Sequence, residues 1–136
     1  TMEDALRLAA LNQCLLRMLY RLRCANQRWR MYSHLLLGEN RWRAMRYSTD
    51  AGLLDLGQQR IVPFAELLEE LIAVVREDAE ALGCVAEIEG LREILQRGTS
   101  AHRQVRVYDE ALQAGATESE ALIAVVDWLV AETARI

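Results

Sequence analysis

The chain has 136 residues, of which 52% are hydrophobic and 26% charged, with one proline and seven glycines. This length suits one domain with a real core, and the composition is typical of a helical globular protein, which excludes a disordered chain. All sixteen basic residues are arginine, and no apolar run approaches the length that spans a membrane, so no membrane partner is predicted.

Charge is unevenly distributed along the chain. Residues 1–47 hold nine arginines against three acidic residues, a net charge of +6, whereas residues 48–136 hold seven arginines against seventeen acidic residues, a net charge of −10. The first part therefore suits a phosphate-bearing ligand, an acidic partner or the acidic remainder of the chain itself. The isoelectric point near 5.2 and the absence of lysine argue against a nucleic-acid partner.

The three cysteines, Cys14, Cys24 and Cys84, are odd in number and form no CxxC pair. Cys14 and Cys24 are ten residues apart on one predicted helix, about 15 Å along its axis, which is beyond disulfide reach. We therefore expect reduced, mostly buried thiols in a cytoplasmic protein. His34 and His102 are far apart in the sequence and no Cys/His cluster has zinc spacing, so no metal site is predicted.

Apolar periodicity and helix end signals predict an all-α fold, about six helices with one short β-hairpin, as a single helical unit over residues 1–136. The helices are expected at residues 2–23, 29–47, 64–82, 85–96, 100–114 and from 118 onward, and the strands at residues 53–56 and 60–62. Pro63 suits the start of the third helix and Gly83 its end, and Thr117 with Glu120 forms a capping box before the last helix. Gly90 weakens the fourth helix or marks close packing.

One stretch of the second predicted helix carries most of the candidate chemistry, Glu-Asn-Arg-Trp-Arg-Ala-Met-Arg-Tyr at residues 39–47. Glu39, Asn40, Arg43, Arg46 and Tyr47 fall within an arc of roughly 120° at 3.6 residues per turn. Polar side chains that point inward must be satisfied by partners or by a ligand.

The same arc carries Tyr32, Leu35 and Leu36 one or two turns earlier, so a face predicted to bury apolar side chains becomes polar without changing direction. Two interpretations follow. One is a ligand site, and the other is a buried salt-bridge network in which Glu39 pairs with Arg43 at i,i+4. Spacing alone favours the salt-bridge network.

A second candidate lies in the first turn of the fifth predicted helix, where Arg103 and Gln104 follow Thr99. Free N–H groups and the positive end of the helix dipole favour an anion there. The alternative is simple capping with a solvated arginine, and spacing alone favours that alternative.

The motif Asn-Arg-Trp-Arg-Ala-Met-Arg-Tyr at residues 40–47 resembles the C-terminal region of the carboxylate–amine ligases, the second type of glutamate–cysteine ligase. The segments that share this order, over nearly the whole chain, are residues 50–55, 62–63, 82–84, 94–99, 101, 103–104 and 125–129. The resemblance implies the trailing helical part of a glutamine-synthetase-like α+β fold. It also implies a parent enzyme that uses ATP and Mg²⁺ to form an amide bond through an acyl phosphate, with glutamate and cysteine as the reference pair.

In such ligases the ATP, the metal ions and most substrate contacts lie on a curved antiparallel sheet. The resemblance therefore implies that the preceding sheet region of the same enzyme is the partner of this chain, that no cofactor binds to this chain alone, and that this fragment alone is inactive. A homo-oligomer is a further expectation.

Carried over to this sequence, the resemblance reverses the preference at the second helix. Asn40 and Arg46 become candidate catalytic residues, with Arg46 stabilising phosphoryl or carboxylate charge and Asn40 orienting a polar substrate group. The candidate substrate- or nucleotide-binding residues are Arg43, Tyr47, Arg103 and Gln104. Two positions depart from the family pattern: Ser48 stands where glycine is usual, and His102 where an acidic residue is common.

The alternative function is a non-catalytic helical protein–protein interaction module whose basic first third docks an acidic protein. A ligase assay and a binding assay discriminate between these two hypotheses.

Overall fold

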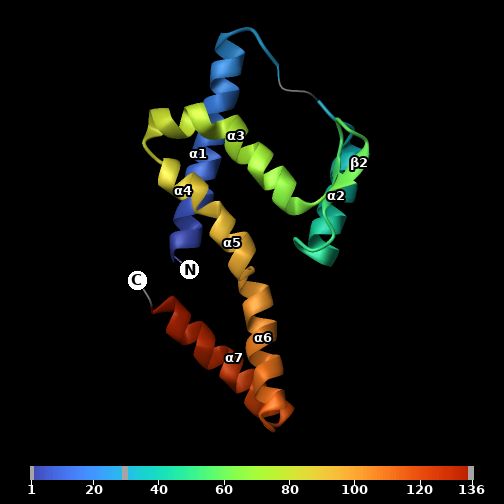
Figure 1. Cartoon of the computed structure of the whole chain (residues 1–136), viewed down its shortest axis with the longest axis vertical. Coiled ribbons are helices and arrows are strands. Elements are labelled where there is room, and N and C mark those ends of the chain that lie inside the picture. Colours follow the sequence, from blue (N-terminus) through green and yellow to red (C-terminus); the bar gives the residue numbers. More distant parts are fainter. Residues whose placement is uncertain (1, 29–30, 135–136) are drawn as a thin grey trace. The chain divides into compact units, whose positions relative to one another are not determined.

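The computed structural model describes residues 2–28 and 31–134, most of which are helical (Figure 1). These residues form seven helices and one hairpin: α1 (Met2–Cys24), α2 (His34–Tyr47), β1 (Leu53–Asp55), β2 (Arg60–Val62), α3 (Phe64–Leu82), α4 (Val85–Glu89), α5 (Leu91–Arg97), α6 (Ser100–Gln113) and α7 (Glu118–Thr133). The predicted all-α class with one short hairpin is confirmed. No helix among the described residues combines the length and apolar character that crossing a membrane requires.

The chain divides into two compact units, Ala10–Glu89 and Thr1–Ala9 with Gly90–Ile136. Whether the two act as the single helical unit predicted from the sequence stays a prediction.

The core of the unit Ala10–Glu89 comes from one face of α1 and one face of α3, with Val62 of β2 and Ile88 of α4. Cys14 and Met18 are buried on α1, and their counterparts on α3 follow the three- and four-residue spacing of an amphipathic helix. The buried apolar residues of α3 are Leu68, Ile72, Val75 and Ala79.

The third helix ends where its sequence predicted. Gly83 adopts the left-handed conformation, with φ at 69°, which costs a glycine nothing because it has no Cβ. The backbone N–H groups of Gly83 and Cys84 bond back to the carbonyls of Glu80 and Ala79. This pattern closes the helix as a Schellman motif.

The hairpin is antiparallel, and Leu54 lies opposite Ile61. Gly52 precedes it with φ at 64°, and a Cβ at this position would lie only 2.4 Å from the carbonyl oxygen of Val62. Both constraints require glycine here, and together they fix how the chain enters β1.

The second helix is shorter than its sequence predicted, and this is a correction. Helix α2 begins at His34 because the Ser33 hydroxyl accepts the Leu35 N–H and caps it, while Trp29, the predicted start, lies outside the described residues. Tyr32 therefore precedes the helix, and Leu35 is 81% exposed. The predicted apolar burial at the start of this face is wrong.

The fourth predicted helix is also corrected, since it is interrupted at Gly90 into α4 and α5. Glycine has the lowest helix propensity after proline, so the break falls at the residue whose sequence signal was ambiguous.

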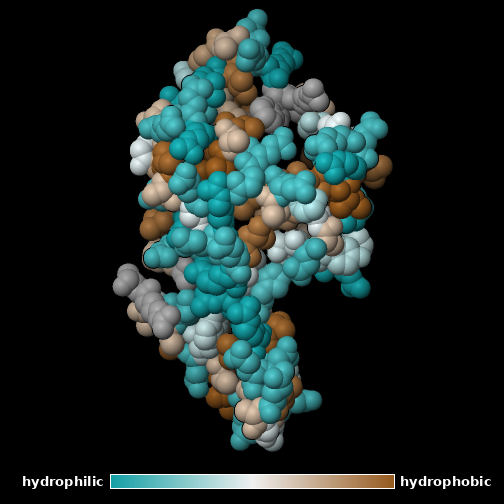
Figure 2. Space-filling model, viewed as in Figure 1, coloured by the Kyte–Doolittle hydropathy of each residue, from teal (hydrophilic) through white to brown (hydrophobic). Residues whose placement is uncertain are grey.

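In the unit Thr1–Ala9 with Gly90–Ile136, α6 and α7 pack side by side as an antiparallel pair (Figure 1). The capping box before α7 is confirmed, since Glu120 accepts the N–H of Thr117 at 2.8 Å. Ala121 is fully buried, whereas Leu122 and Val126 on the same helix are exposed. Apolar side chains of α7 therefore lie open on the surface of this unit (Figure 2).

Candidate functional site

The Asn40 side chain joins α2 to the hairpin. Its amide nitrogen donates to the carbonyl oxygen of Leu54 at 2.8 Å, and its amide oxygen accepts the backbone N–H of Leu54 at 2.7 Å. A carboxamide presents an N–H donor and a carbonyl acceptor side by side, which matches the C=O and N–H of one extended residue, so both backbone groups of Leu54 are satisfied at once. The predicted substrate-orienting group is thus engaged within the fold.

Arg43 fixes the connection between α2 and β1. Its Nη2 donates to the carbonyl of Ala51 at 3.0 Å and its Nε to the carbonyl of Gly52 at 3.2 Å, and the side chain is only 15% exposed. The Glu39 carboxylate lies 4.0 Å from Nη1. The ion pair at i,i+4 that spacing favoured is therefore present, although the backbone carbonyls are the closer partners.

Tyr47 lies at the end of α2 in an aromatic arrangement. Its ring meets that of Trp42 edge to face, with centroids 5.7 Å apart and planes at 88°, and the Arg43 guanidinium carbon lies 5.9 Å from its centroid. Both geometries are favourable for an aromatic ring, which has a negative face and a positive edge. The ring is held while 40% of the residue stays exposed, which suits a side chain that presents its hydroxyl to a ligand.

Arg46 differs from the other members of the cluster. It is exposed in the last turn of α2, and its guanidinium has no hydrogen-bond or ion-pair partner among residues 2–28 and 31–134. The N–H donors of Arg46 are therefore available to an oxyanion, in the bidentate geometry that suits carboxylates and phosphates. Asn40, Arg43 and Tyr47 hold the end of α2 from which Arg46 projects.

The second predicted pair belongs to the other compact unit. Arg103 on α6 makes two contacts with the Glu132 carboxylate on α7, at 3.1 and 3.0 Å, and its guanidinium carbon lies 4.7 Å from the centroid of the Trp128 ring. Gln104 donates to the Ser100 hydroxyl at 3.1 Å. The Arg103 guanidinium therefore joins α6 to α7 through the Glu132 carboxylate. Its predicted role in ligand binding stays a prediction.

His102 explains its own departure from the family pattern. Its Nδ1 accepts the backbone N–H of Thr99 at 3.1 Å, which is the bond that a glutamate or glutamine makes at this position of a capping box. An imidazole nitrogen thus takes the place of the acidic side chain as the acceptor.

Asp78 is a residue that the sequence analysis missed. Its carboxylate is fully buried on α3 and accepts hydrogen bonds from Arg17 and Arg21 of α1, the latter at 3.0 Å. Burial alone would raise the pKa of Asp78, but the hydrogen bonds from Arg21 and Arg17 outweigh it, so the pKa of the carboxyl is lowered. Its signal was the three-residue spacing from Val75, which places it on the buried apolar face of α3.

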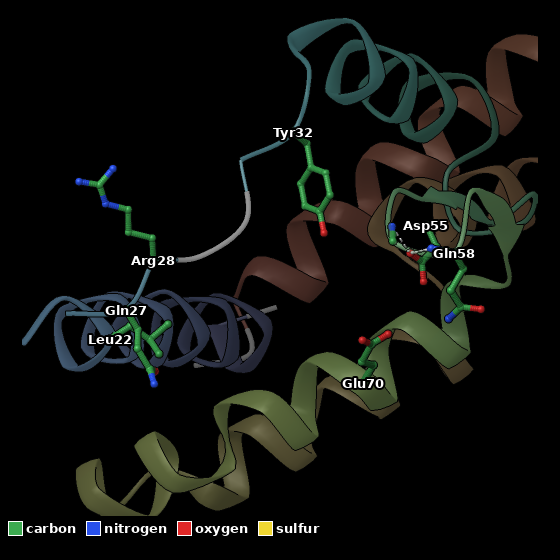
Figure 3. Close-up of a pocket in the computed structure, with 8 residues that line it drawn as sticks. Leu22, Gln27, Arg28, Tyr32, Asp55, Gln58 and Glu70 are labelled. Carbon is green, nitrogen blue, oxygen red and sulfur yellow. Dashed lines mark hydrogen bonds between the residues drawn. The ribbon is translucent and has the colours of Figure 1, made fainter. Parts of the chain in front are cut away.

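A cavity of about 770 Å³ opens between the end of α1, the hairpin turn and α3 (Figure 3). The Asp55 carboxylate at the edge of the cavity accepts hydrogen bonds from the N–H groups of Gly57 and Gln58, and Glu70 of α3 also lines the cavity. The hydrogen bonds from the N–H groups of Gln58 and Gly57 lower the pKa of Asp55. None of the predicted site residues lines this cavity, so the candidate site remains at α2.

Comparison with known families gives a match over residues 1–126 to the family described as glutamate–cysteine ligase family 2. The chain belongs to this family. The resemblance carried by the motif at residues 40–47 is thereby confirmed.

Curated relatives with the provisional name glutamate–cysteine ligase 2 include proteins from Rhodospirillum rubrum, 59% identical over 97% of this chain, and Paracoccus denitrificans, 48% identical over 98% of it. A protein from Solibacter usitatus with the same name is 37% identical over 97% of the chain. The matched regions are 34%, 36% and 32% of those proteins, so the chain spans about a third of the length of these glutamate–cysteine ligase family 2 members. No solved structure matches the chain significantly.

A size-conserving substitution tests the Asn40 contact. Asn40→Asp keeps the size and the acceptor for the Leu54 N–H but places a carboxylate oxygen against the Leu54 carbonyl. We expect a loss of about 1–3 kcal/mol in the free energy of unfolding, because a donor is removed and two acceptors then face each other. Urea unfolding followed by tryptophan fluorescence measures it, since Trp42 lies on the same helix. The exposed Gln13→Glu on α1 is the control, and an equal loss in both variants would refute a specific role for the Asn40 contact.

Proposed function

We propose that this chain is the helical portion of an ATP-dependent carboxylate–amine ligase of the glutamate–cysteine type. Family membership over residues 1–126 supports the ligase class, and the relatives that are about three times longer support a parent enzyme of which this is one part. The structural observation that carries the proposal is Arg46, whose guanidinium has no partner in the described part of the chain, at the end of a helix where Asn40 and Arg43 are engaged.

In the proposed reaction ATP phosphorylates the carboxylate substrate, and the amine then displaces phosphate from the acyl phosphate to form the amide. Negative charge develops on phosphoryl and carboxyl oxygens in both steps. We assign Arg46 to that charge, because catalysis of phosphoryl transfer rests on positioning and on electrostatic stabilisation. Tyr47 would position a substrate group through its hydroxyl.

Asn40 and Arg43 take a different place in the proposal. Their donors already bond to Leu54, Ala51 and Gly52, so direct contact with a substrate would require those bonds to break. We therefore propose that they act as positioning residues that hold the end of α2 and the connection to β1.

The proposal places Mg²⁺ and most of the ATP contacts on the part of the parent enzyme outside this chain. Within residues 2–28 and 31–134, no three His, Cys, Asp or Glu side chains are grouped as a metal ion would require. Arg46 is suited to an oxyanion and not to a cation. Accordingly we assign no metal ligand to this chain.

A ligase assay tests the proposal. Glutamate, cysteine and Mg-ATP are supplied to the 136-residue chain and to a full-length parent enzyme of this family, and amide formation and phosphate release are measured. We expect turnover by the parent and none by the chain alone. Turnover by the chain would refute the assignment of the metal and nucleotide contacts to the remainder of the enzyme, and a parent that releases no phosphate with any acid and amine would refute the ligase proposal.

The second candidate, a helical interaction module, is favoured by the exposure of apolar side chains on α2. Leu35, Trp42 and Met45 are all exposed, and exposed apolar surface of this kind marks an interaction site. The same surface is expected where a ligase fragment meets the rest of its enzyme. A module that binds an acidic protein without any effect of nucleotide on affinity would favour the second candidate.

A further inference from the structure

Two thiols that are distant in the sequence meet in the unit Ala10–Glu89. The Sγ atom of Cys14, on α1, lies 3.5 Å from the Sγ atom of Cys84, directly after the C-cap of α3. Both are free thiols. Neither belongs to the proposed ligase site on α2.

The two sulfur atoms are close enough to form a covalent bond after a small movement. A disulfide bond is about 2.05 Å long, so the sulfurs must approach by roughly 1.5 Å. Rotation about the side-chain bonds of two cysteines, with small backbone adjustment, supplies a movement of this size. Helix α1 and the joint between α3 and α4 are therefore already placed for a cross-link.

The two thiols differ in their access to solvent. Cys14 is fully buried, whereas Cys84 is half-buried. Burial, and then the contact with Cys84, raises the pKa of Cys14 to about 11; nearby Asp78 adds to this effect and Arg17 opposes it. An oxidant in solution consequently meets Cys84 first, and Cys14 waits behind it as a protonated thiol.

We propose that Cys14 and Cys84 form a redox-active pair that closes an intramolecular disulfide when the chain meets a peroxide. The Cys84 sulfur attacks a peroxide oxygen, the O–O bond breaks, and the displaced oxygen leaves as water or alcohol, which oxidises Cys84 to the sulfenic acid. The Cys14 sulfur then attacks the Cys84 sulfur, the S–O bond breaks, and the hydroxyl group leaves as water with the Cys14 proton. Two thiols are oxidised by two electrons and one peroxide is reduced.

The bond would enclose α2 and the hairpin within one covalent loop, since both lie between Cys14 and Cys84 in the sequence. A cross-link of this kind limits the unfolded chain more than the folded one. Oxidation therefore should raise the urea concentration at the unfolding midpoint, and a reducing dithiol should reverse the change.

Peptide mapping of the 136-residue chain tests the pair. The reduced chain is treated with limiting hydrogen peroxide, its remaining thiols are alkylated in acid-quenched denaturant, and the digest is read by mass spectrometry without reduction. We expect a linked peptide that contains Cys14 and Cys84, an alkylated Cys24, and loss of the linked peptide after dithiothreitol. The same treatment in urea should give no preference among the three cysteines.

Two variants sharpen the result. Cys24→Ser should keep the linked peptide and the rise in the unfolding midpoint, whereas Cys84→Ser should lose both, with circular dichroism confirming that each variant is folded. The proposal is overturned by links that involve only Cys24, by further oxidation of Cys84 while Cys14 remains alkylatable, or by the same mixture of products from folded and urea-unfolded chain. These outcomes leave the ligase proposal untouched, because that proposal is read from amide formation.

Discussion

Arg46→Ala in a full-length enzyme of this family should lower kcat by about 10²–10³, the cost of removing one preorganised donor from a developing oxyanion. The expected loss is large because the Arg46 guanidinium is the unpaired cation of its cluster among the described residues. Its removal should leave the fold intact, since it bonds to no described side chain or backbone group. Steady-state rates of phosphate release, with helicity followed by circular dichroism, measure both parts of this expectation.

Arg41→Ala is the matched control for that experiment. Arg41 is an exposed arginine on the same helix and has no part in the proposed site, so its loss should leave kcat unchanged. Arg46→Lys should recover only part of the rate, because an ammonium group lacks the planar fork that binds two oxygens of one oxyanion. Equal kcat values for Arg46→Ala and the wild-type enzyme would show that Arg46 has no catalytic role.

Asp78→Asn should lower the free energy of unfolding of this chain by about 3 kcal/mol, because it leaves two arginines facing a buried neutral group. The side chain of Asp78 is fully buried, while those of Arg17 and Arg21 are 37% and 38% exposed. Partial hydration of the two arginines places the expected cost at the low end for a broken buried pair. Urea unfolding at neutral pH measures it.

Glu77→Gln supplies the control, since Glu77 also pairs with Arg21, at 3.2 Å, but is 66% exposed. We expect a loss below about 1 kcal/mol, as for other solvent-exposed ion pairs. A cost for Glu77→Gln that equals that of Asp78→Asn would contradict the assignment of the stability to burial.

Wild type and Asp78→Asn, compared at several pH values, give the pH dependence of this contribution to stability. The pKa of Asp78 is lower in the folded chain than in the unfolded chain, so the unfolded state binds the proton more readily. The stability that the carboxylate contributes is therefore complete above about pH 4, near the ordinary pKa of aspartate, and is lost as the pH falls through the folded pKa. The difference in unfolding free energy between wild type and Asp78→Asn should accordingly shrink below about pH 4.

Local signals predicted most of the elements. The end of α3 at Leu82 and the capping box of α7 followed from residues that act on their own backbone neighbours, so sequence alone was sufficient. The predicted start of α2 was wrong because the apolar pattern continues through Ser33, whereas the Ser33 side chain caps the helix there. The break at Gly90 follows from the low helix propensity of glycine, but the apolar pattern that continues past this residue predicted one helix.

The polar face of α2 shows where sequence reasoning reached its limit. Spacing brought Asn40, Arg43, Arg46 and Tyr47 together, and the structure places all four on α2 near the hairpin. The partners of Asn40 and Arg43 are backbone carbonyls of residues 51–54, and carbonyl positions leave no trace in a pattern of side chains. The thiol pair and the Asp78 cluster were hidden for a related reason, since each joins helices through a tertiary contact.

The connection from α2 to β1 has a consequence for how members of the family can diverge. Asn40 bonds to the N–H and the C=O of Leu54 in the strand, and Arg43 bonds to the two carbonyls just before the strand. These two side chains therefore fix the length of the connection. One residue more or fewer here would offer a neighbouring residue to Asn40 and turn every strand side chain to the opposite face. Residues of this connection other than Gly52 can therefore be substituted, whereas its length cannot change.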